Sequence, residues 1–172
     1  MTLKSILEKT GKILGLELDF SSPTETEELL IECGKDVVSV LCGEYVDLKD
    51  IREIGVSGNR ISYSAFPNLV KKILRVEQNG VDVDFEVFTN YIAIPETRGT
   101  CRVKYTFIPN ITSITQNLEL PSKFTEYVMA TGVAAEYCLR KGLYTEAEIY
   151  AGKYNVSLKN IMQINAAVRI GR

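Results

Sequence analysis

The spacing of apolar residues changes twice along the chain, and this feature most limits what the chain can fold into. Apolar residues recur every three or four positions up to Gly43, alternate with polar residues over 46–108, and return to the first spacing from Phe124. The first spacing is typical of amphipathic helices and the second of half-buried strands. We therefore predict an α+β fold, a helical bundle with two N-terminal and two C-terminal helices and an inserted small antiparallel β lobe.

The length of the chain is typical of one domain. With 172 residues, 45% of them hydrophobic, the chain can bury roughly 70% of its unfolded surface. We predict a single domain over 1–172, with a helical part at 1–45 and 118–164, a β lobe at 46–117 and a C-terminal tail at 165–172.

Capping signals predict where the first two helices begin. The first helix starts after Thr2 as N-cap and ends near Gly15. The second has Ser22 as N-cap, Pro23 at the first helical position and Glu25 three residues after the cap, which completes a capping box. Its predicted buried stripe consists of Leu30, Cys33, Val37, Val40 and Leu41.

The last third of the sequence predicts an antiparallel pair of helices. The third helix covers 124–139, its small residues allow close approach of a neighbouring helix, and Gly142 suits the left-handed position after its end. The fourth begins with Thr145 as cap and Glu148 at the capping-box position. The predicted buried faces are Phe124, Tyr127, Val128, Thr131, Ala134, Ala135 and Cys138 on the third helix, and Ala147, Tyr150, Tyr154, Leu158 and Ile161 on the fourth.

Turn signals divide the alternating region into short strands. Ser57-Gly58-Asn59 predicts one hairpin, and Asn79-Gly80, the strongest short hairpin signal, predicts a second. The predicted strands are 51–56, 61–66, 70–77, 81–87, 91–94 and 101–107. Such strands form a small antiparallel sandwich or a barrel-like lobe.

The composition disfavours several classes of function. The chain has no histidine, which removes the usual Ser-His and Cys-His nucleophile pairs. A zinc site would need most of Cys33, Cys42, Cys101 and Cys138 to converge, so we expect buried free thiols and neither metal nor cofactor. A formal charge of −2 gives no general attraction for DNA or anionic lipid. Without a long apolar run, the chain is expected to be soluble and intracellular, with no membrane partner.

A row of carboxylates is the one candidate for metal chemistry. Asp82, Asp84 and Glu86 alternate with apolar residues, so a strand would place all three on one face. Oxygen ligands of this kind hold divalent cations, and a metal-dependent hydrolase is the corresponding alternative function. The simpler interpretation, which we favour, is an exposed polar face opposite Val81, Val83, Phe85 and Val87.

A short basic cluster is the one local candidate for contact with DNA. Lys71, Lys72 and Arg75 lie near the start of a predicted strand, but no aromatic platform flanks them. We interpret them as a solvated sheet edge, where lysines discourage unwanted strand pairing.

The C-terminal segment is a candidate partner-binding element. No acidic residue follows Glu148, and the apolar residues continue beyond what the fourth helix needs for packing. Two interpretations stay open: a frayed terminus, or a tail that becomes ordered when it inserts into a partner. On the second, the partner-binding residues are Asn165, Val168, Arg169, Ile170 and Arg172.

The order of elements and two short phrases resemble a known family. The phrases are Ser62-Tyr63-Ser64-Ala65-Phe66-Pro67 in the β insertion and the helical hairpin sequence from Gly132 to Ala147. With the flanking helix pairs, they resemble the head–tail connector adaptors of tailed bacteriophages and are similar in layout to the tail tubular protein A type of short-tailed phages. The resemblance covers most of the chain but includes no catalytic signature.

The resemblance implies a structural protein of the virion and not an enzyme. Such adaptors form a ring, commonly of twelve copies, between the portal protein and a downstream tail or nozzle protein. DNA passes through the channel without specific binding. The C-terminal tail would reach the portal, and the protein would be made in the cytoplasm of the host bacterium and located at the head–tail junction. A tail-completion or head-stabilising protein of a phage is the alternative.

Overall fold

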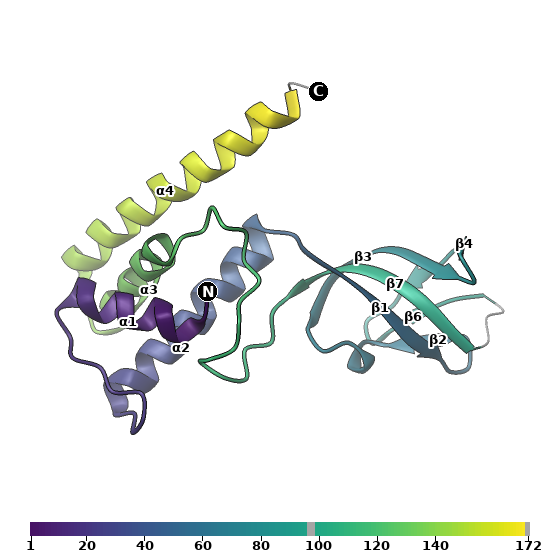
Figure 1. Cartoon of the computed structure of the whole chain (residues 1–172), viewed down its shortest axis with the longest axis horizontal. Helices are drawn as coiled ribbons and strands as arrows, with labels where there is room; N and C mark the ends of the chain where they lie inside the picture. The colour runs from purple at the N-terminus through teal and green to yellow at the C-terminus, as the bar shows by residue number, and fades with distance from the viewer. Residues whose placement is uncertain (96–98, 171–172) are drawn as a thin grey trace. The chain divides into compact units, whose positions relative to one another are not determined.

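The computed structural model describes residues 1–95 and 99–170, with side chains described as far as residue 163. Its helices and antiparallel strands confirm the α+β class (Figure 1). The chain divides into two compact units, which we call the helical unit, Met1–Val38 with Ile111–Arg172, and the β unit, Ser39–Asn110. The β unit is thus an insertion into the helical unit, and its ends lie seven residues before the boundaries predicted at 45/46 and 117/118.

The first helix begins and ends where its caps predict. Helix α1 spans Leu3–Leu14, and the Thr2 side chain accepts a hydrogen bond from the Ser5 backbone N–H at 3.1 Å. Gly15 follows in the left-handed conformation with φ of 69°, where a side chain on any other residue would be strained. Local sequence signals are sufficient at both ends of this helix.

The second helix begins two residues later than predicted. Helix α2 spans Glu25–Val40, and a π-helical turn, Leu41–Tyr45, extends it. Instead of Ser22 with Glu25, the residues that interact are Thr24, just before the helix, and Glu27, whose carboxylate accepts the Thr24 backbone N–H at 2.9 Å. The capping box is therefore displaced by two residues along the same Ser/Thr-rich and Glu-rich sequence.

The buried stripe of α2 agrees with the prediction at three of its five positions. Leu30, Cys33 and Leu41 are buried, but Val37 is only partly buried and Val40 is 53% exposed. Val38 and Gly34 are buried instead. A Cβ atom added to Gly34 would lie 2.7 Å from Leu3 Cδ1, so glycine at this position lets α1 pack closely against α2.

The last two helices form the predicted hairpin with small shifts at their ends. Helix α3 spans Glu126–Arg140 with Thr125 as N-cap, and helix α4 spans Tyr144–Ile170. The predicted cap Thr145 therefore lies inside α4. Between the helices, Gly142 is left-handed with φ of 74°, as predicted.

The prediction for the buried face of α3 was wrong at one aromatic residue. Tyr127 is 52% exposed, whereas Met129, Ala130 and Val133 are completely buried. The predicted face spread over too wide an arc, and α3 contacts both α1 and α4 through its small residues. Phe124, predicted as helical, is buried just before the helix begins.

The strands of the β unit form two antiparallel sheets. The larger has the order β1-β7-β3-β4, and the smaller has the order β2-β6-β5. The long strands β1, β7 and β3 lie side by side in Figure 1. The bounds are β1 Leu48–Val56, β2 Arg60–Ser62, β3 Leu69–Gln78, β4 Val81–Asp82, β5 Glu86–Val87, β6 Tyr91–Ala93 and β7 Gly99–Ile108, with a 3₁₀ turn at Tyr63–Ala65.

The turns form where predicted, but neither hairpin continues as expected. Ser57 and Arg60 exchange two backbone hydrogen bonds around left-handed Gly58 and Asn59. However, β1 then pairs with β7 along its whole length, and β2 pairs with β6. Similarly, β3 pairs with β4 at only two positions beyond the left-handed turn at Asn79. Turn residues determine the reversal of the chain, whereas distant strands determine the pairing.

The core of the β unit lies on the face of the larger sheet that carries Cys101, Val103, Tyr105 and Phe107 of β7, which we call the inner face. Tyr105 on β7 is completely buried, and Phe66 packs edge-on against its ring with centroids 4.7 Å apart. The Tyr105 hydroxyl donates a hydrogen bond to the Asp50 carboxylate at 3.1 Å. The other buried residues of the strands and their turns include Leu48, Ile54, Ile61, Ile73, Val76, Ile92, Ile94, Cys101, Val103 and Phe107.

Candidate partner-binding site

The N-terminal half of α4 packs closely on α3. Ala147, Leu158 and Ile161 are buried on one side of α4. On α3, a Cβ atom added to Gly132 would lie 3.0 Å from the Tyr154 ring, so the ring rests directly on the glycine backbone. This contact confirms that small residues on the third helix allow close approach of its neighbour.

The opposite side of α4 carries a second, uncovered set of apolar positions. Ile149 is 52% exposed and Val156 is 59% exposed, and their separation of seven residues places them on one line along the helix. Gly152 lies between them, with no atom within 4 Å of the position that a Cβ would occupy. We call Ile149, Gly152 and Val156 the outer stripe.

Helix α4 is also much longer than the helix that covers it. Its 27 residues correspond to about 40 Å, whereas the 15 residues of α3 correspond to about 22 Å. Figure 1 shows the C-terminal turns of α4 extending beyond α3. The backbone of α4 is therefore longer by about 18 Å than that of the helix it packs against.

The predicted partner-binding residues belong to this C-terminal part of the chain. The backbone of α4 is helical as far as Ile170. The side chains of Asn165, Val168, Arg169 and Ile170, and the whole of Arg172, lie outside the described residues. Their role as a portal contact stays a prediction.

An arginine at the end of α3 connects α2 and α3. The Arg140 guanidinium donates to the Glu136 carboxylate at 2.8 Å, contacts Asp36 on α2 and lies 3.7 Å from Glu32. The hydrogen bonds that the guanidinium donates, first to Glu136 and then to Asp36, raise the pKa of Arg140 above its ordinary value. The sequence alone does not indicate these contacts, because the partners of Arg140 on α2 are more than 100 residues away.

The predicted row of carboxylates does not form one continuous face. Asp82 ends β4 and contacts Arg75, Glu86 begins β5, and Asp84 lies in the irregular segment between them. Within residues 1–95 and 99–163, no three His, Cys, Asp or Glu side chains come together as a metal site. Asp84 and Glu86 line one hollow, whereas Asp82 is held by Arg75, so the three carboxylates do not form the single row that the sequence predicts.

The apolar residues that alternate with these carboxylates are only partly covered. Val83 and Phe85 are half-buried, but Val81 is 67% exposed and Val87 is 61% exposed. Asp82, Asp84 and Glu86 are exposed, as predicted, but the strand breaks between the two sheets, so Val81 and Val87 are exposed as well.

A hollow of about 790 Å³ lies beside this broken segment. Asp84, Glu86, Phe88 and Tyr91 are among its lining residues. The rings of Phe88 and Tyr91 stack with centroids 4.8 Å apart, and the Arg60 guanidinium covers Tyr91 at 4.4 Å from the ring centroid. The stacked rings and the guanidinium suit contact with an apolar or planar side chain of a partner.

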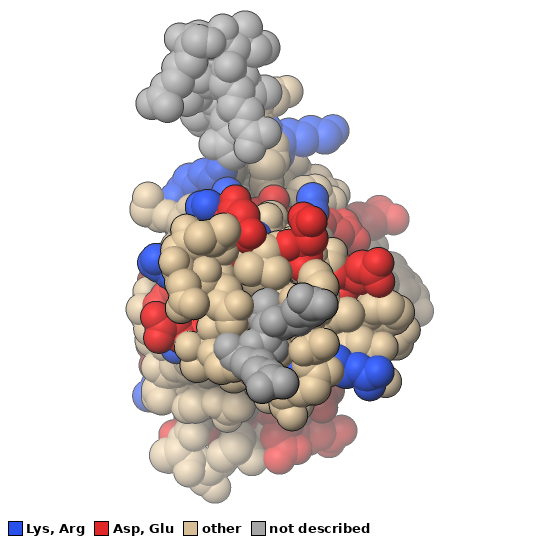
Figure 2. Space-filling model, turned by 90° about the vertical axis from the view of Figure 1, so that its right-hand side faces the viewer, with Lys and Arg blue, Asp and Glu red and all other residues tan. Residues whose placement is uncertain are grey.

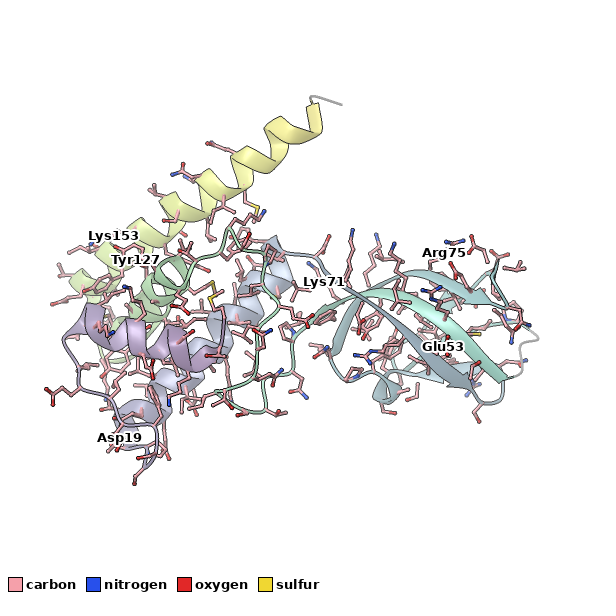
Figure 3. The ribbon with its side chains drawn as sticks, viewed as in Figure 1. Asp19, Glu53, Lys71, Arg75, Tyr127 and Lys153 are labelled. Atoms are coloured by element: carbon pink, nitrogen blue, oxygen red, sulfur yellow. The ribbon has the colours of Figure 1, made fainter. Side chains whose placement is uncertain are left out.

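The residues of the predicted basic cluster, Lys71, Lys72 and Arg75, all lie on β3 but have different surroundings in the structure. Lys71 forms an ion pair with Asp47 at 3.0 Å and donates to the Cys42 carbonyl at 3.2 Å, and Arg75 pairs with Glu77 at 2.7 Å (Figure 3). Two β-bulges lie between Val70 and Lys72 and between Ile73 and Arg75. They turn Lys72 and Arg75 to the outer face of the sheet, on which Lys49 and Lys104 also lie.

The four cysteines are buried and free, which confirms the prediction for them. Burial raises the pKa of both Cys33 and Cys42 to about 11, and it raises the pKa of Cys138 as well. Each of these thiols is therefore protonated at neutral pH and chemically inert.

The charges of the surface agree with the near-zero total. The face in Figure 2 carries acidic and basic side chains separated by uncharged areas. In the part of the chain that the structure describes, no helix is long and apolar enough to cross a bilayer.

Two features of the surface were missed at the level of sequence. The outer stripe of α4 has a detectable signal, because Ile149 and Val156 are separated by two helical turns. The lysines on the large sheet have no such signal in the sequence, because the register of β1, β7 and β3 brings them together.

A scan against protein-family models and a search of curated protein sequences find no match to this chain.

Proposed function

We propose that this chain is a structural protein of a tailed-bacteriophage virion, a head–tail adaptor that assembles as a ring between portal and tail. The observation that carries the proposal is the outer stripe of α4, where Ile149 and Val156 are exposed. This helix is about 18 Å longer than α3 and has exposed apolar residues opposite its packed side. Apolar residues in line on a helix are typical of a surface that another helix covers.

The element order supports the choice of an adaptor among assembly proteins. A helix pair, a β insertion and a closing helical hairpin are the layout on which the resemblance to phage adaptors rests. In the proposed assembly, the helical units of neighbouring copies form the wall of the ring, and the β units provide contacts with the downstream tail protein. A chain with a formal charge of −2 suits a channel that DNA must cross without being held.

The C-terminal turns of α4 would provide the contact with the portal. The segment 149–172 contains no acidic residue and four basic ones, Lys153, Lys159, Arg169 and Arg172. Its apolar residues would enter a groove on the portal, and its basic residues would meet an acidic rim.

The test is to mix the purified protein with the portal protein of the same phage and to examine the mixture by electron microscopy. We expect the protein to be monomeric or weakly associated alone and to form rings on the portal. Deleting 165–172 should abolish portal binding while leaving the melting temperature of the helical unit nearly unchanged. As a control of matched length, Val168→Ser with Ile170→Ser should weaken binding without shortening the helix.

Two results would contradict this proposal. A truncated protein that binds the portal with unchanged affinity would remove the role of the C-terminal turns. Density from whole virions that places the protein away from the portal would favour a tail-completion or head-stabilising protein instead.

A further inference from the structure

Three lysines, one from each of three strands, lie on the outer face of the large sheet. Lys49 on β1 and Lys72 on β3 lie on either side of Thr106 on β7, and Lys104 lies two residues from Thr106 on the same face. All three lysines are exposed, whereas Thr106 beneath them is buried. Two strand spacings separate Lys49 from Lys72 by about 10 Å. We call Lys49, Lys72 and Lys104 the lysine row.

The positive charge of the lysine row is not neutralised within the described residues. The neighbouring cations Lys71 and Arg75 form ion pairs, but among the described residues no carboxylate lies within 4.0 Å of the three ammonium groups. The register places Lys104 directly opposite Arg75, and like charges at directly opposite positions destabilise a sheet. An arrangement of this kind is stabilised when an anionic partner covers it.

The other end of the same face has the opposite character. The register places Glu53 and Glu77 on either side of Arg102, and Asp82 lies opposite Glu77 on the sheet edge. A DNA duplex, with one charge for about 1.7 Å of its axis, would meet these carboxylates as well as the lysines. The face therefore suits a protein partner whose negative charge is confined to a short segment.

Helix α2 presents such a segment. Glu25, Glu28 and Glu32 are exposed, and their spacings of three and four residues place them on one side of the helix. Glu25 and Glu28 have no basic side chain within 4.0 Å in the described part of the chain, whereas Glu32 forms an ion pair with Arg140 at 3.7 Å. The helical rise separates Glu25 from Glu32 by about 10.5 Å. We call these three residues the acidic stripe.

We infer that the lysine row of one copy binds the acidic stripe of α2 of a second copy. This inference rests on the proposed function, because it names a contact between neighbouring copies of the assembly. Lys49 and Lys72 are about 10 Å apart, close to the separation of about 10.5 Å between Glu25 and Glu32, and Lys104 lies to one side of the line between the two lysines. Exposed ion pairs are individually weak, which gives a contact that forms on the assembly and is weak between free copies.

Charge reversal on the two surfaces tests the inference directly. The variant K49E/K72E makes the lysine row acidic, and E25K/E28K makes the acidic stripe basic. We expect each variant alone to associate about tenfold or more weakly than the wild type at low ionic strength. An equimolar mixture should recover association, because each reversed surface then meets a complementary surface on the other variant. Sedimentation velocity over a range of concentrations measures this.

The control variants make the same change in net charge at positions outside the two proposed surfaces. K9E/K12E on α1 changes the net charge as K49E/K72E does, and E17K/E119K in exposed loops matches E25K/E28K. Both controls should associate like the wild type, apart from the small effect of net charge. Thermal melting followed by circular dichroism confirms that every variant is folded.

Several outcomes overturn the inference and leave the proposed function standing. One is that both reversal variants form rings on the portal as well as the wild type does. Another is that their mixture associates no better than either variant alone. A third is salt-sensitive binding of duplex DNA that K49E/K72E removes and E25K/E28K does not, which would assign the lysine row to nucleic acid. Absence of rings with any portal, even for the wild type, contradicts the proposed function itself.

Discussion

Two substitutions on opposite sides of α4 should separate the effect on folding from the effect on assembly. Leu158→Ala should destabilise the fold, whereas Val156→Ala should weaken ring formation without destabilising the fold. Leu158 is 5% exposed on the side that packs on α3, and Val156 is 59% exposed in the outer stripe. Leu158→Ala removes the equivalent of three carbon atoms from the core, at about 0.8 kcal/mol each, or about 2.4 kcal/mol of transfer free energy. Incomplete collapse of the space left behind raises the expected loss of unfolding free energy to about 3 kcal/mol.

Val156→Ala is the matched control on the same helix. The exposed side chain loses little buried area, and alanine favours a helix over valine by about 0.5 kcal/mol. We therefore expect the unfolding free energy to be unchanged or slightly higher. If the outer stripe is an assembly surface, the same variant should nevertheless form rings on the portal less readily than the wild type.

Urea unfolding followed by far-UV circular dichroism measures the two stabilities. With a denaturant slope of about 2 kcal/mol per molar urea, Leu158→Ala should lower the midpoint by about 1.5 M. The midpoint for Val156→Ala should lie within about 0.3 M of the wild type. Equal destabilisation by the two variants, or a larger effect of Val156→Ala, would refute the assignment of the packed and uncovered sides of α4.

Three further predictions concern local structure. Thr125→Ala removes the side-chain oxygen that caps α3 and should lower the unfolding free energy by about 1 kcal/mol, measured by urea unfolding. Hydrogen bonds, first from the Thr24 side chain, lower the pKa of Glu27 below its ordinary value of 4.5. The ionised carboxylate therefore stabilises the fold above pH 4.5, that contribution is lost as the pH falls through the lowered pKa, and Glu27→Gln should flatten the acid side of a melting-temperature profile. Because burial raises the pKa of Cys33 and Cys42 to about 11, Ellman's reagent should modify them in the native protein only at the rate of local unfolding; rapid labelling at neutral pH would contradict their burial.

The sequence predicts best what depends on neighbouring residues. The Thr2 cap, the left-handed Gly142 and the turn at Asn79 each depend on a few adjacent residues, and each forms as predicted. The shift of the α2 capping box from Ser22 to Thr24 has a simple cause. Both residues can cap, and the choice depends on the Glu27 carboxylate, which also accepts the backbone N–H of Asp19 at 3.2 Å.

Features that depend on distant segments could not be predicted in the same way. The strict alternation of 81–87 is a strong strand signal, yet the chain leaves the larger sheet after Asp82 and joins the smaller one at Glu86. The exposure of Tyr127 depends on where α1 and α4 lie around α3. The lysine row depends on the register of three strands and on two bulges, neither of which a single sequence encodes locally.

Insertion of the β unit has a consequence for the order of folding during synthesis. The buried Thr10 hydroxyl donates to the Ile6 carbonyl and also reaches the Ala130 carbonyl, 120 residues further along the chain. Helices α1 and α2 therefore leave the ribosome long before their packing partner α3 exists, whereas all strands of the β unit are available by Ile108. If the β unit folds first, the segment between Val38 and Ile111 is no longer a flexible chain. The flexible loop that must close when α1 packs on α3 is then shorter. A nascent chain arrested before Glu126 should hence contain a folded centre and protease-sensitive N-terminal helices.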